Sequence, residues 1–204
     1  MLFRSALIVT VVGWFNKRLS LPLSVIGMAA SLYAAVKAFF MVLSEGSVHY
    51  FLGNWKPPFG IEYVVDYLNG LVLVLIAGVS LLTLLYSKRG VEKELGDKQT
   101  SFYAIFLLFV TGLLGITITG DAFNLYVLLE ISSLSCYGLI AFGRGRAYMA
   151  TFNYLIMGTI GACFYLLGVG YLFIKTGSLN MIDMNQLLMA LHGSKAVLVG
   201  FIRS

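Results

Sequence analysis

Residues Asp121 to Arg146 read DAFNLYVLLEISSLSCYGLIAFGRGR, an apolar run that ends in a basic cluster. From Ala122 to Phe142 the only charged residue is Glu130. At about 1.5 Å per helical residue, this run is long enough to cross a hydrocarbon layer of roughly 30 Å. The sequence therefore predicts a transmembrane helix in which Glu130 lies roughly 13 Å from the start, close to the bilayer midplane.

The depth of Glu130 makes it a candidate functional residue. A charge at the bilayer centre costs on the order of 2.5 to 3.5 kcal/mol on insertion scales, and such residues usually belong to ion or proton pathways. The alternative is a structural glutamate that only hydrogen-bonds a neighbouring helix, although Gln or Ser would do that at lower cost. We predict that Glu130 is a proton carrier.

Polar side chains accompany Glu130 on the predicted helix. Tyr126, Ser133 and Tyr137 lie within one or two turns of it on the same side, so their hydroxyls are expected to support the carboxylate. Lys37 is a further supporting polar residue, near the end of another predicted span. Its long side chain is expected to reach the membrane interface.

The composition indicates a polytopic membrane protein. Of the 204 residues, 59% are hydrophobic and only 11% are charged, against about 25% charged residues in soluble domains. This excludes a soluble or secreted enzyme, and no Ser/His/Asp or Cys/His constellation is present. The net charge of +5 comes from residues between spans and predicts no nucleic-acid partner. Two isolated cysteines predict neither a metal site nor a cofactor.

The apolar runs predict an all-α bundle of about six spans plus the start of a seventh. The first run is too short to span alone, so it is either an interfacial helix or the end of a span that starts earlier. The seventh run begins near Leu187 or Ala196. The first six runs cover residues 6–15, 19–43, 64–86, 102–119, 121–142 and 151–174.

Three connections between the spans have their own patterns. Residues 44–63 alternate strand-like side chains around Gly53 and Asn54, which predicts a small extramembrane hairpin. The charged segment 87–100 and the polar segment 175–185 are expected to be loops. Asp121 is expected to cap the helix that follows it, because a carboxylate there accepts helix N–H groups.

Basic residues predict the orientation. Loops on one side carry eight Lys and Arg residues and those on the other side carry four, so the first side is expected to be cytoplasmic and the N-terminus external. The eight are Lys17, Arg18, Lys88, Arg89, Lys93, Lys98, Arg144 and Arg146.

Three stretches resemble the antiporter-like subunits shared by Mrp-type cation/proton antiporters, respiratory complex I and membrane-bound hydrogenases. TGDAFNLYVLLEISSLSCYGLIAFG, residues 119–143, is similar to the fifth span of that family. Residues 53–87 are similar to its third span, and residues 153–184 to its sixth span. Among these subunits, the sequence most resembles the D-type member of the Mrp antiporters.

The resemblance implies a partial antiporter-like fold in which Glu130 matches the family's intramembrane glutamate. That glutamate pairs with a lysine on span seven, and the stretch that follows this lysine is absent here. Arg203 comes too early to take its place. We therefore expect residues 1–204 to form a single transmembrane domain, the N-terminal part of a longer subunit.

The implied function is proton translocation as a membrane subunit of a multisubunit Na⁺/proton antiporter. Two alternatives stay open, a proton-pumping subunit of an NADH-quinone oxidoreductase or hydrogenase complex, and a structural or assembly subunit without transport. The expected partners are other membrane subunits, protons, Na⁺ and the lipid bilayer. The chain is expected in the prokaryotic cell membrane, as a transporter subunit rather than an enzyme.

Overall fold

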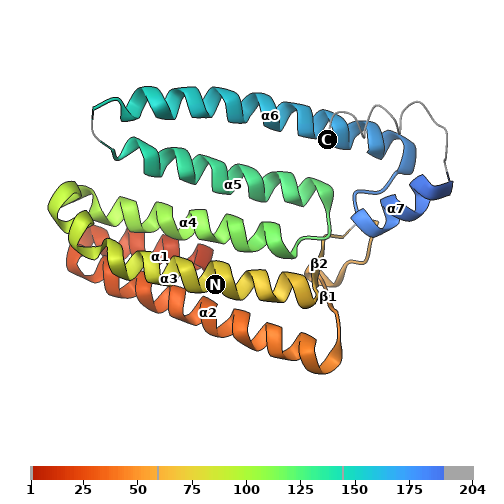
Figure 1. Ribbon diagram of the computed structural model, residues 1–204, viewed down its shortest axis with the longest axis horizontal. Coiled ribbons are helices and arrows are strands. Elements are labelled where there is room, and N and C mark those ends of the chain that lie inside the picture. Colours follow the sequence, from red (N-terminus) through yellow and green to blue (C-terminus); the bar gives the residue numbers. More distant parts are fainter. Residues whose placement is uncertain (1, 59, 144, 191–204) are drawn as a thin grey trace.

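Six helices run alongside one another in the computed structural model, which describes residues 2–58, 60–143 and 145–190 (Figure 1). Consecutive helices are antiparallel, and a short helix, α7, lies at one end of the bundle (Figure 1). The expected all-α membrane bundle is confirmed. The helices are α1 Leu2–Phe15, α2 Ser20–Glu45, α3 Tyr67–Leu95, α4 Gln99–Ile118, α5 Ala122–Ala141, α6 Ala147–Thr176 and α7 Met181–Ala190.

Four helical stretches of the described chain are long and apolar enough to cross a membrane: Lys17–Glu45, Tyr67–Ile118, Ala122–Ala141 and Ala147–Thr176. The second stretch turns back at Gly96, whose φ is 48°, and contains the antiparallel helices α3 and α4. Five helices, α2 to α6, therefore have the length and the apolar surface of membrane spans.

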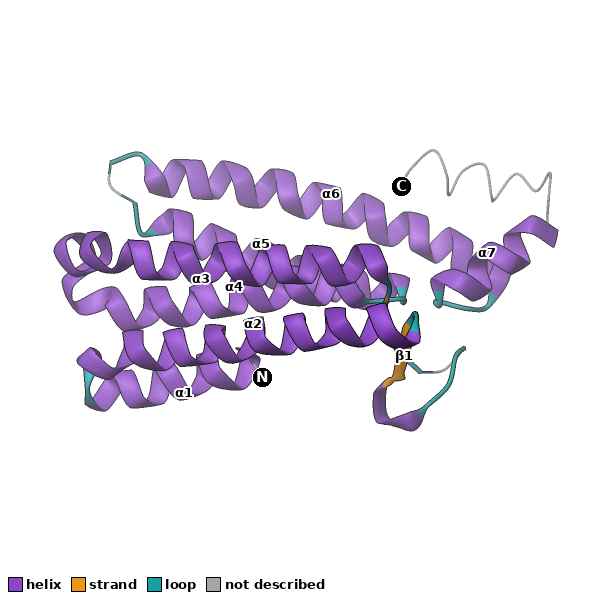
Figure 2. Cartoon of the chain, turned by 60° about the horizontal axis from the view of Figure 1, so that its bottom comes forward, coloured by secondary structure: helices purple, strands orange, loops and turns teal. Residues whose placement is uncertain are grey.

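The first apolar run forms α1, which packs against α2 and α4 and runs alongside the other helices of the bundle (Figure 2). Its side chains Leu2, Ala6 and Val9 are buried in the main core. The interfacial alternative for this run is therefore wrong. The physical reason is that these three residues recur on one face of the helix, where they complete the packing of α4.

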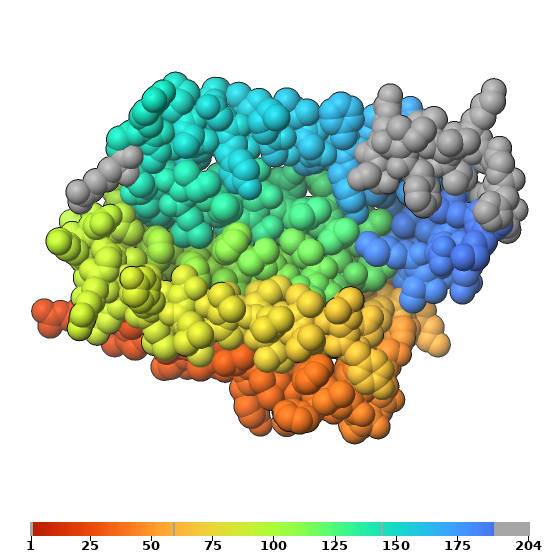
Figure 3. Space-filling view, viewed as in Figure 1, coloured from red at the N-terminus to blue at the C-terminus, as the bar shows by residue number. Residues whose placement is uncertain are grey.

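Helix α4 is the centre of the packing, because it contacts α1, α2, α3 and α5. Its buried side chains include Tyr103, Leu107 and Val110, which join the core formed with α1, α2 and α3. Helix α6 lies at the edge of the bundle and packs on α5 and α7 (Figure 3). Its large exposed side chains, such as Phe152 and Met157, therefore suit lipid or a neighbouring subunit.

Two predicted loops are partly helical. Helix α3 continues through the charged segment to Leu95, because Lys, Arg and Glu are strong helix formers, and a short 3-10 turn, η3 Gly96–Lys98, follows. In the segment 175–185, α6 ends at Thr176 and α7 begins at Met181. The predicted seventh-span start at Leu187 lies within α7, whereas Ala196 and Arg203 lie outside the described residues.

The predicted hairpin is confirmed. Strand β1, Val48–Phe51, pairs antiparallel with β2, Glu62–Val65, and Phe51 lies opposite Glu62. The 3-10 turn η2, Leu52–Asn54, leaves β1 with Gly53 and Asn54 at φ 65° and 63°. Positive φ suits Gly and Asn better than other residues, so these two positions let the chain turn.

The predicted basic loops meet at the end of the bundle opposite this hairpin (Figure 1). The amine of Lys17, in the 3-10 turn η1 Lys17–Leu19, lies 2.6 Å from Asp97 in η3. This ion pair joins the α1–α2 and α3–α4 connections. Arg144, counted with the same group, lies outside the described residues.

This arrangement predicts which positions are accessible from each side of the membrane. With Cys136 and Cys163 replaced by Ala, a single cysteine at Glu94 should react with an impermeant thiol reagent only from the cytoplasmic side. A cysteine at Asn54, near the hairpin, should react only from outside. Labelling of intact cells and of inverted vesicles measures both, and reaction of both positions from the same side contradicts the orientation.

Candidate functional site

Glu130 lies in the middle of α5, the ninth of its 20 residues, and its side chain is partly buried. Helix α5 packs between α4 and α6 (Figure 1). The length of the helix therefore places this carboxyl far from both ends of α5. The environment of Glu130 depends on how α5 meets its two neighbours.

The α4 side of α5 is closely packed. A Cβ added at Gly112 would lie 2.7 Å from the Cβ of Ser132, and one at Gly115 would lie 2.5 Å from Leu128. The hydroxyl of Ser132 donates to the carbonyl of Leu129 in its own helix, at 2.9 Å. The small residues of α4 thus bring the two backbones close together and leave little room for a titrating side chain.

The α6 side of α5 is lined by aromatic residues. The rings of Tyr126 and Tyr165 are stacked with centroids 6.4 Å apart, and those of Tyr137 and Tyr154 meet edge-on at 5.1 Å. Glu130 is one turn from Tyr126 and two turns from Tyr137, so it belongs to this side of the helix. The antiparallel pairing places it level with residues 158–162 of α6, where Gly158, Gly161 and Ala162 are all small.

The predicted supporting residues have different roles in the structure. No hydrogen bond or ion pair joins Glu130 to any residue of the described part of the chain, and the rings of Tyr126 and Tyr137 contact α6. Ser133 is partly buried on α5. Lys37 is exposed on α2, with its amine 5.8 Å from the ring centroid of Tyr33, and α4 lies between α2 and α5. The structure therefore does not bring Lys37 to Glu130.

Asp121 caps α5 as predicted. Its carboxylate accepts the backbone N–H of Asn124 at 2.6 Å, and the side chain is buried. Burial raises the pKa of the Asp121 carboxyl, while the N–H groups of Asn124 and Phe123 partly oppose the shift. The hydroxyl of Tyr165 donates to the Ala122 carbonyl at 3.0 Å, so α6 also holds the start of α5.

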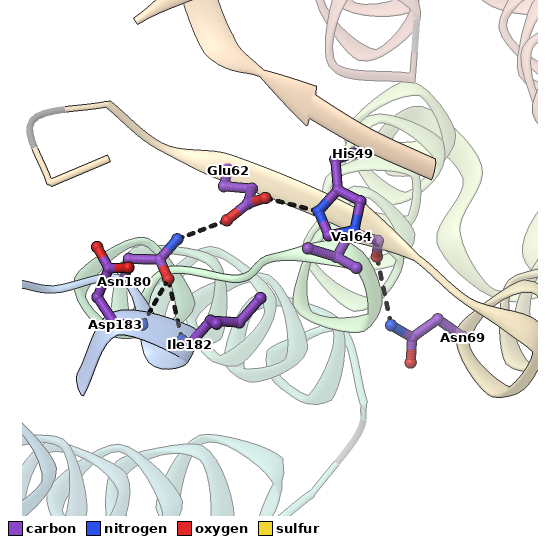
Figure 4. A network of polar contacts seen from close by, with 7 residues as sticks. All are labelled: His49, Glu62, Val64, Asn69, Asn180, Ile182 and Asp183. Atoms are coloured by element: carbon purple, nitrogen blue, oxygen red, sulfur yellow. Dashed lines mark hydrogen bonds and ion pairs between the residues drawn. The ribbon is translucent and has the colours of Figure 1, made fainter. Parts of the chain in front are cut away.

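A second polar cluster lies at the hairpin end of the bundle (Figure 4). Glu62 is buried, with its side chain 7% exposed, and its Oε1 is 2.7 Å from Nδ1 of the half-exposed His49. Its Oε2 accepts a hydrogen bond from Nδ2 of the buried Asn180 at 2.6 Å. The Asn180 Oδ1 in turn accepts the backbone N–H of Ile182, at 2.9 Å, and that of Asp183, at 3.2 Å, in the first turn of α7.

This Glu62 cluster joins three connections of the chain. The Glu62 carbonyl accepts the N–H of Gly120 at 2.8 Å in the α4–α5 link. The same link exchanges hydrogen bonds with the α6–α7 link, since Ala122 N–H donates to Leu179 and Met181 N–H donates to Gly120. The start of the helix that carries Glu130 is therefore tied to the hairpin and to α7.

Sequence reasoning missed the Glu62 cluster. Glu62 and Asn180 are separated by 118 positions, so no local pattern joins them. The one available indication was an acidic residue, Glu62, in a short strand opposite a strand that contains His49.

An antiparallel bundle with helices long and apolar enough to cross a membrane defines a multi-pass cell membrane protein. Residues 119–203 match the family described as NADH:quinone oxidoreductase/Mrp antiporter, TM. The chain is a homologue of the antiporter-like membrane subunits of NADH-quinone oxidoreductases and Mrp-type antiporters. The resemblance of the sequence to this family is thereby confirmed, with both N-type and D-type subunits among the relatives.

Two relatives and one solved structure show the extent of the likeness. The N-type subunit of the NADH-quinone oxidoreductase of Desulforudis audaxviator is 46% identical over 190 residues, which cover 91% of this chain and 38% of that protein. The D-type subunit of a probable K⁺/H⁺ antiporter of Rhizobium meliloti is 36% identical over 155 residues, 76% of this chain and 28% of that protein. The chain thus spans between a quarter and two fifths of the length of these relatives.

The solved structure is that of the membrane-bound sulfane sulfur reductase, an archaeal respiratory membrane complex. It is similar over 99% of this chain and 41% of the compared chain, with 33% identity and a TM-score of 0.92. The arrangement of α1 to α7 is therefore a membrane-subunit fold already found in a respiratory complex.

Proposed function

We propose that this chain provides part of a proton-translocation path as a membrane subunit of a multisubunit complex, with Glu130 as its proton carrier. One observation carries the proposal, a carboxyl at the middle of a membrane span with no hydrogen-bonding or charged partner among the described residues. A glutamate whose role was to join two helices would be bonded to one of them. A role in proton exchange therefore explains the position of Glu130 better than a structural role does.

The position of Glu130 between α5 and α6 supports the same role. The α4 side is closed by glycine-to-helix contacts, and the α6 side is equally close at Gly158, where an added Cβ would clash with the hydroxyl of Tyr137. Farther along α6, an added Cβ at the exposed Gly161 would meet no atom within 4 Å. Tyr126, Ser133 and Tyr137 provide hydroxyls along this side of α5. We infer that these hydroxyls form water-mediated hydrogen bonds with Glu130 in both its protonated and its deprotonated form. Lys37 has no place in this path, because it lies on the far side of α4.

Two sources of energy fit the homologues. A cation gradient is the source that the name of the Rhizobium meliloti relative implies, and electron transfer is the source that an NADH-quinone oxidoreductase or a sulfane sulfur reductase implies. Na⁺ is the cation that we place first for an antiporter. The redox-coupled function is favoured specifically by the 46% identity to the Desulforudis audaxviator relative over 91% of the chain.

Inverted membrane vesicles that contain the assembled complex separate these functions. An antiporter is expected to dissipate a preformed pH gradient when Na⁺ or K⁺ is added, without any electron donor. A redox-driven pump is expected to build a gradient only with a donor and a quinone or sulfur acceptor. Vesicles from cells that lack the chain are the control, and unchanged proton movement in those vesicles contradicts any transport role and leaves the assembly function.

A further inference from the structure

A cleft of about 330 Å³ opens at the basic end of the bundle, away from Glu130 and from the Glu62 cluster. Four elements line it: η1 with Lys17 and Arg18, the start of α2 with Leu21, the end of α3 with Lys88 and Glu92, and the first residue of α4. The cleft therefore combines three cations and one acid with an apolar wall.

Exposed aromatic side chains next to the cleft indicate its level relative to the membrane–water interface. Trp14 and Phe15, in the last turn of α1, are 88% and 89% exposed, and only Asn16 separates them from η1. Tyr86 is 90% exposed and lies two residues before Lys88 on α3. Trp and Tyr gather where a membrane protein passes from hydrocarbon to headgroups. The cations that follow these aromatics are thus at the level of lipid headgroups.

Two of the three cations take part in no ion pair within the described chain. Lys17 is paired with Asp97 at 2.6 Å. Arg18 and Lys88 form no ion pair with any residue in the described ranges, although both line the same cleft. Basic pockets between membrane helices bind anionic lipid headgroups.

We propose that this cleft binds the headgroup of an anionic phospholipid, with its phosphate between Arg18 and Lys88. The acyl chains lie along the apolar side of α2 that begins at Leu21. Glu92 lies one helical turn after Lys88, and its carboxylate can accept a hydrogen bond from a hydroxyl group. Because a glycerol headgroup carries such hydroxyls, the cleft favours it over a bare phosphate. Bound there, the lipid holds the η1 turn against the ends of α3 and α4.

The test uses the full chain in nanodiscs of phosphatidylcholine with a minor fraction of phosphatidylglycerol, and counts retained lipids by native mass spectrometry. The wild-type chain is expected to retain phosphatidylglycerol selectively. The double variant R18Q/K88Q should reduce the amount of retained phosphatidylglycerol by about tenfold or more. The control K93Q/K98Q removes two charges from the same end outside the cleft and should retain it like the wild type.

Further arms keep the result decisive if R18Q/K88Q folds poorly. The variant R18K/K88R keeps both charges and is expected to keep the selectivity. Equal losses in R18Q/K88Q and K93Q/K98Q would mean general attraction to a basic surface and overturn the proposal. Equal retention of phosphatidylcholine would overturn it as well. Inorganic phosphate is expected to leave the unfolding temperature unchanged, and a stabilisation equal to that by phosphatidylglycerol would assign the cleft to a free anion instead.

Discussion

Replacement of Glu130 by Gln is expected to lower proton transport by about tenfold or more while the complex still assembles. Gln keeps the shape of the side chain and its capacity for hydrogen bonds, but it cannot release a proton. Replacement by Asp shortens the side chain by one methylene and retains a titrating carboxyl, so partial activity should remain. Proton flux in inverted vesicles with the assembled complex measures all three proteins.

The comparison between the two variants separates chemistry from packing. A glutamate that served only to fill space between α5 and α6 would tolerate Gln better than Asp. The control Glu94→Gln removes an exposed carboxyl from the charged end of α3 and should transport at the wild-type rate. If Glu130→Gln assembles and transports like the wild type, Glu130 is not the proton carrier.

Replacement of Glu62 by Ala is expected to lower the free energy of unfolding by about 2 to 3 kcal/mol, the second large effect. The variant leaves the amide of Asn180, only 2% exposed, without the carboxylate oxygen that it donates to at 2.6 Å. A buried donor without an acceptor carries its full desolvation cost. Chemical unfolding of the chain in detergent measures the loss.

The control Glu62→Gln preserves both contacts, because its Oε1 accepts from Asn180 while its Nε2–H group donates to an unprotonated His49 Nδ1. Its stability should stay within about 1 kcal/mol of the wild type. Hydrogen exchange at the Gly120 and Met181 amides should accelerate in Glu62→Ala and not in Glu62→Gln, since these amides belong to the links that the Glu62 cluster joins. Equal stability of all three proteins would show that the cluster does not hold these links together.

The sequence by itself determined the class of the protein and the course of most spans. Five apolar runs became membrane-length helices, because hydrophobic length is a property of one continuous segment. The hairpin around Gly53 and the cap at Asp121 were also predictable. Each depends on side chains within a few residues of the backbone groups that they satisfy.

The charged residues at the membrane boundary led to a wrong prediction of where a helix ends. The charged residues after Tyr86 predicted a loop, yet α3 continues to Leu95, because polarity ends a membrane span without ending a helix. The position of α1 could not be predicted for a different reason. Its apolar run is short, and its place in the bundle depends on its contacts with α4.

Only the tertiary structure decided which faces of the helices meet and which distant residues become partners. Glycines of α4 close one side of α5, aromatic rings of α6 contact the other, and Glu130 lies on the second side. Glu62 and Asn180 are 118 positions apart, and Lys17 and Asp97 are 80 apart. Within a bilayer such pairings follow from close packing of small residues and from the need to satisfy buried polar groups. Close packing and the pairing of buried polar groups both involve residues from two different segments. The sequence pattern of a single segment therefore cannot predict them.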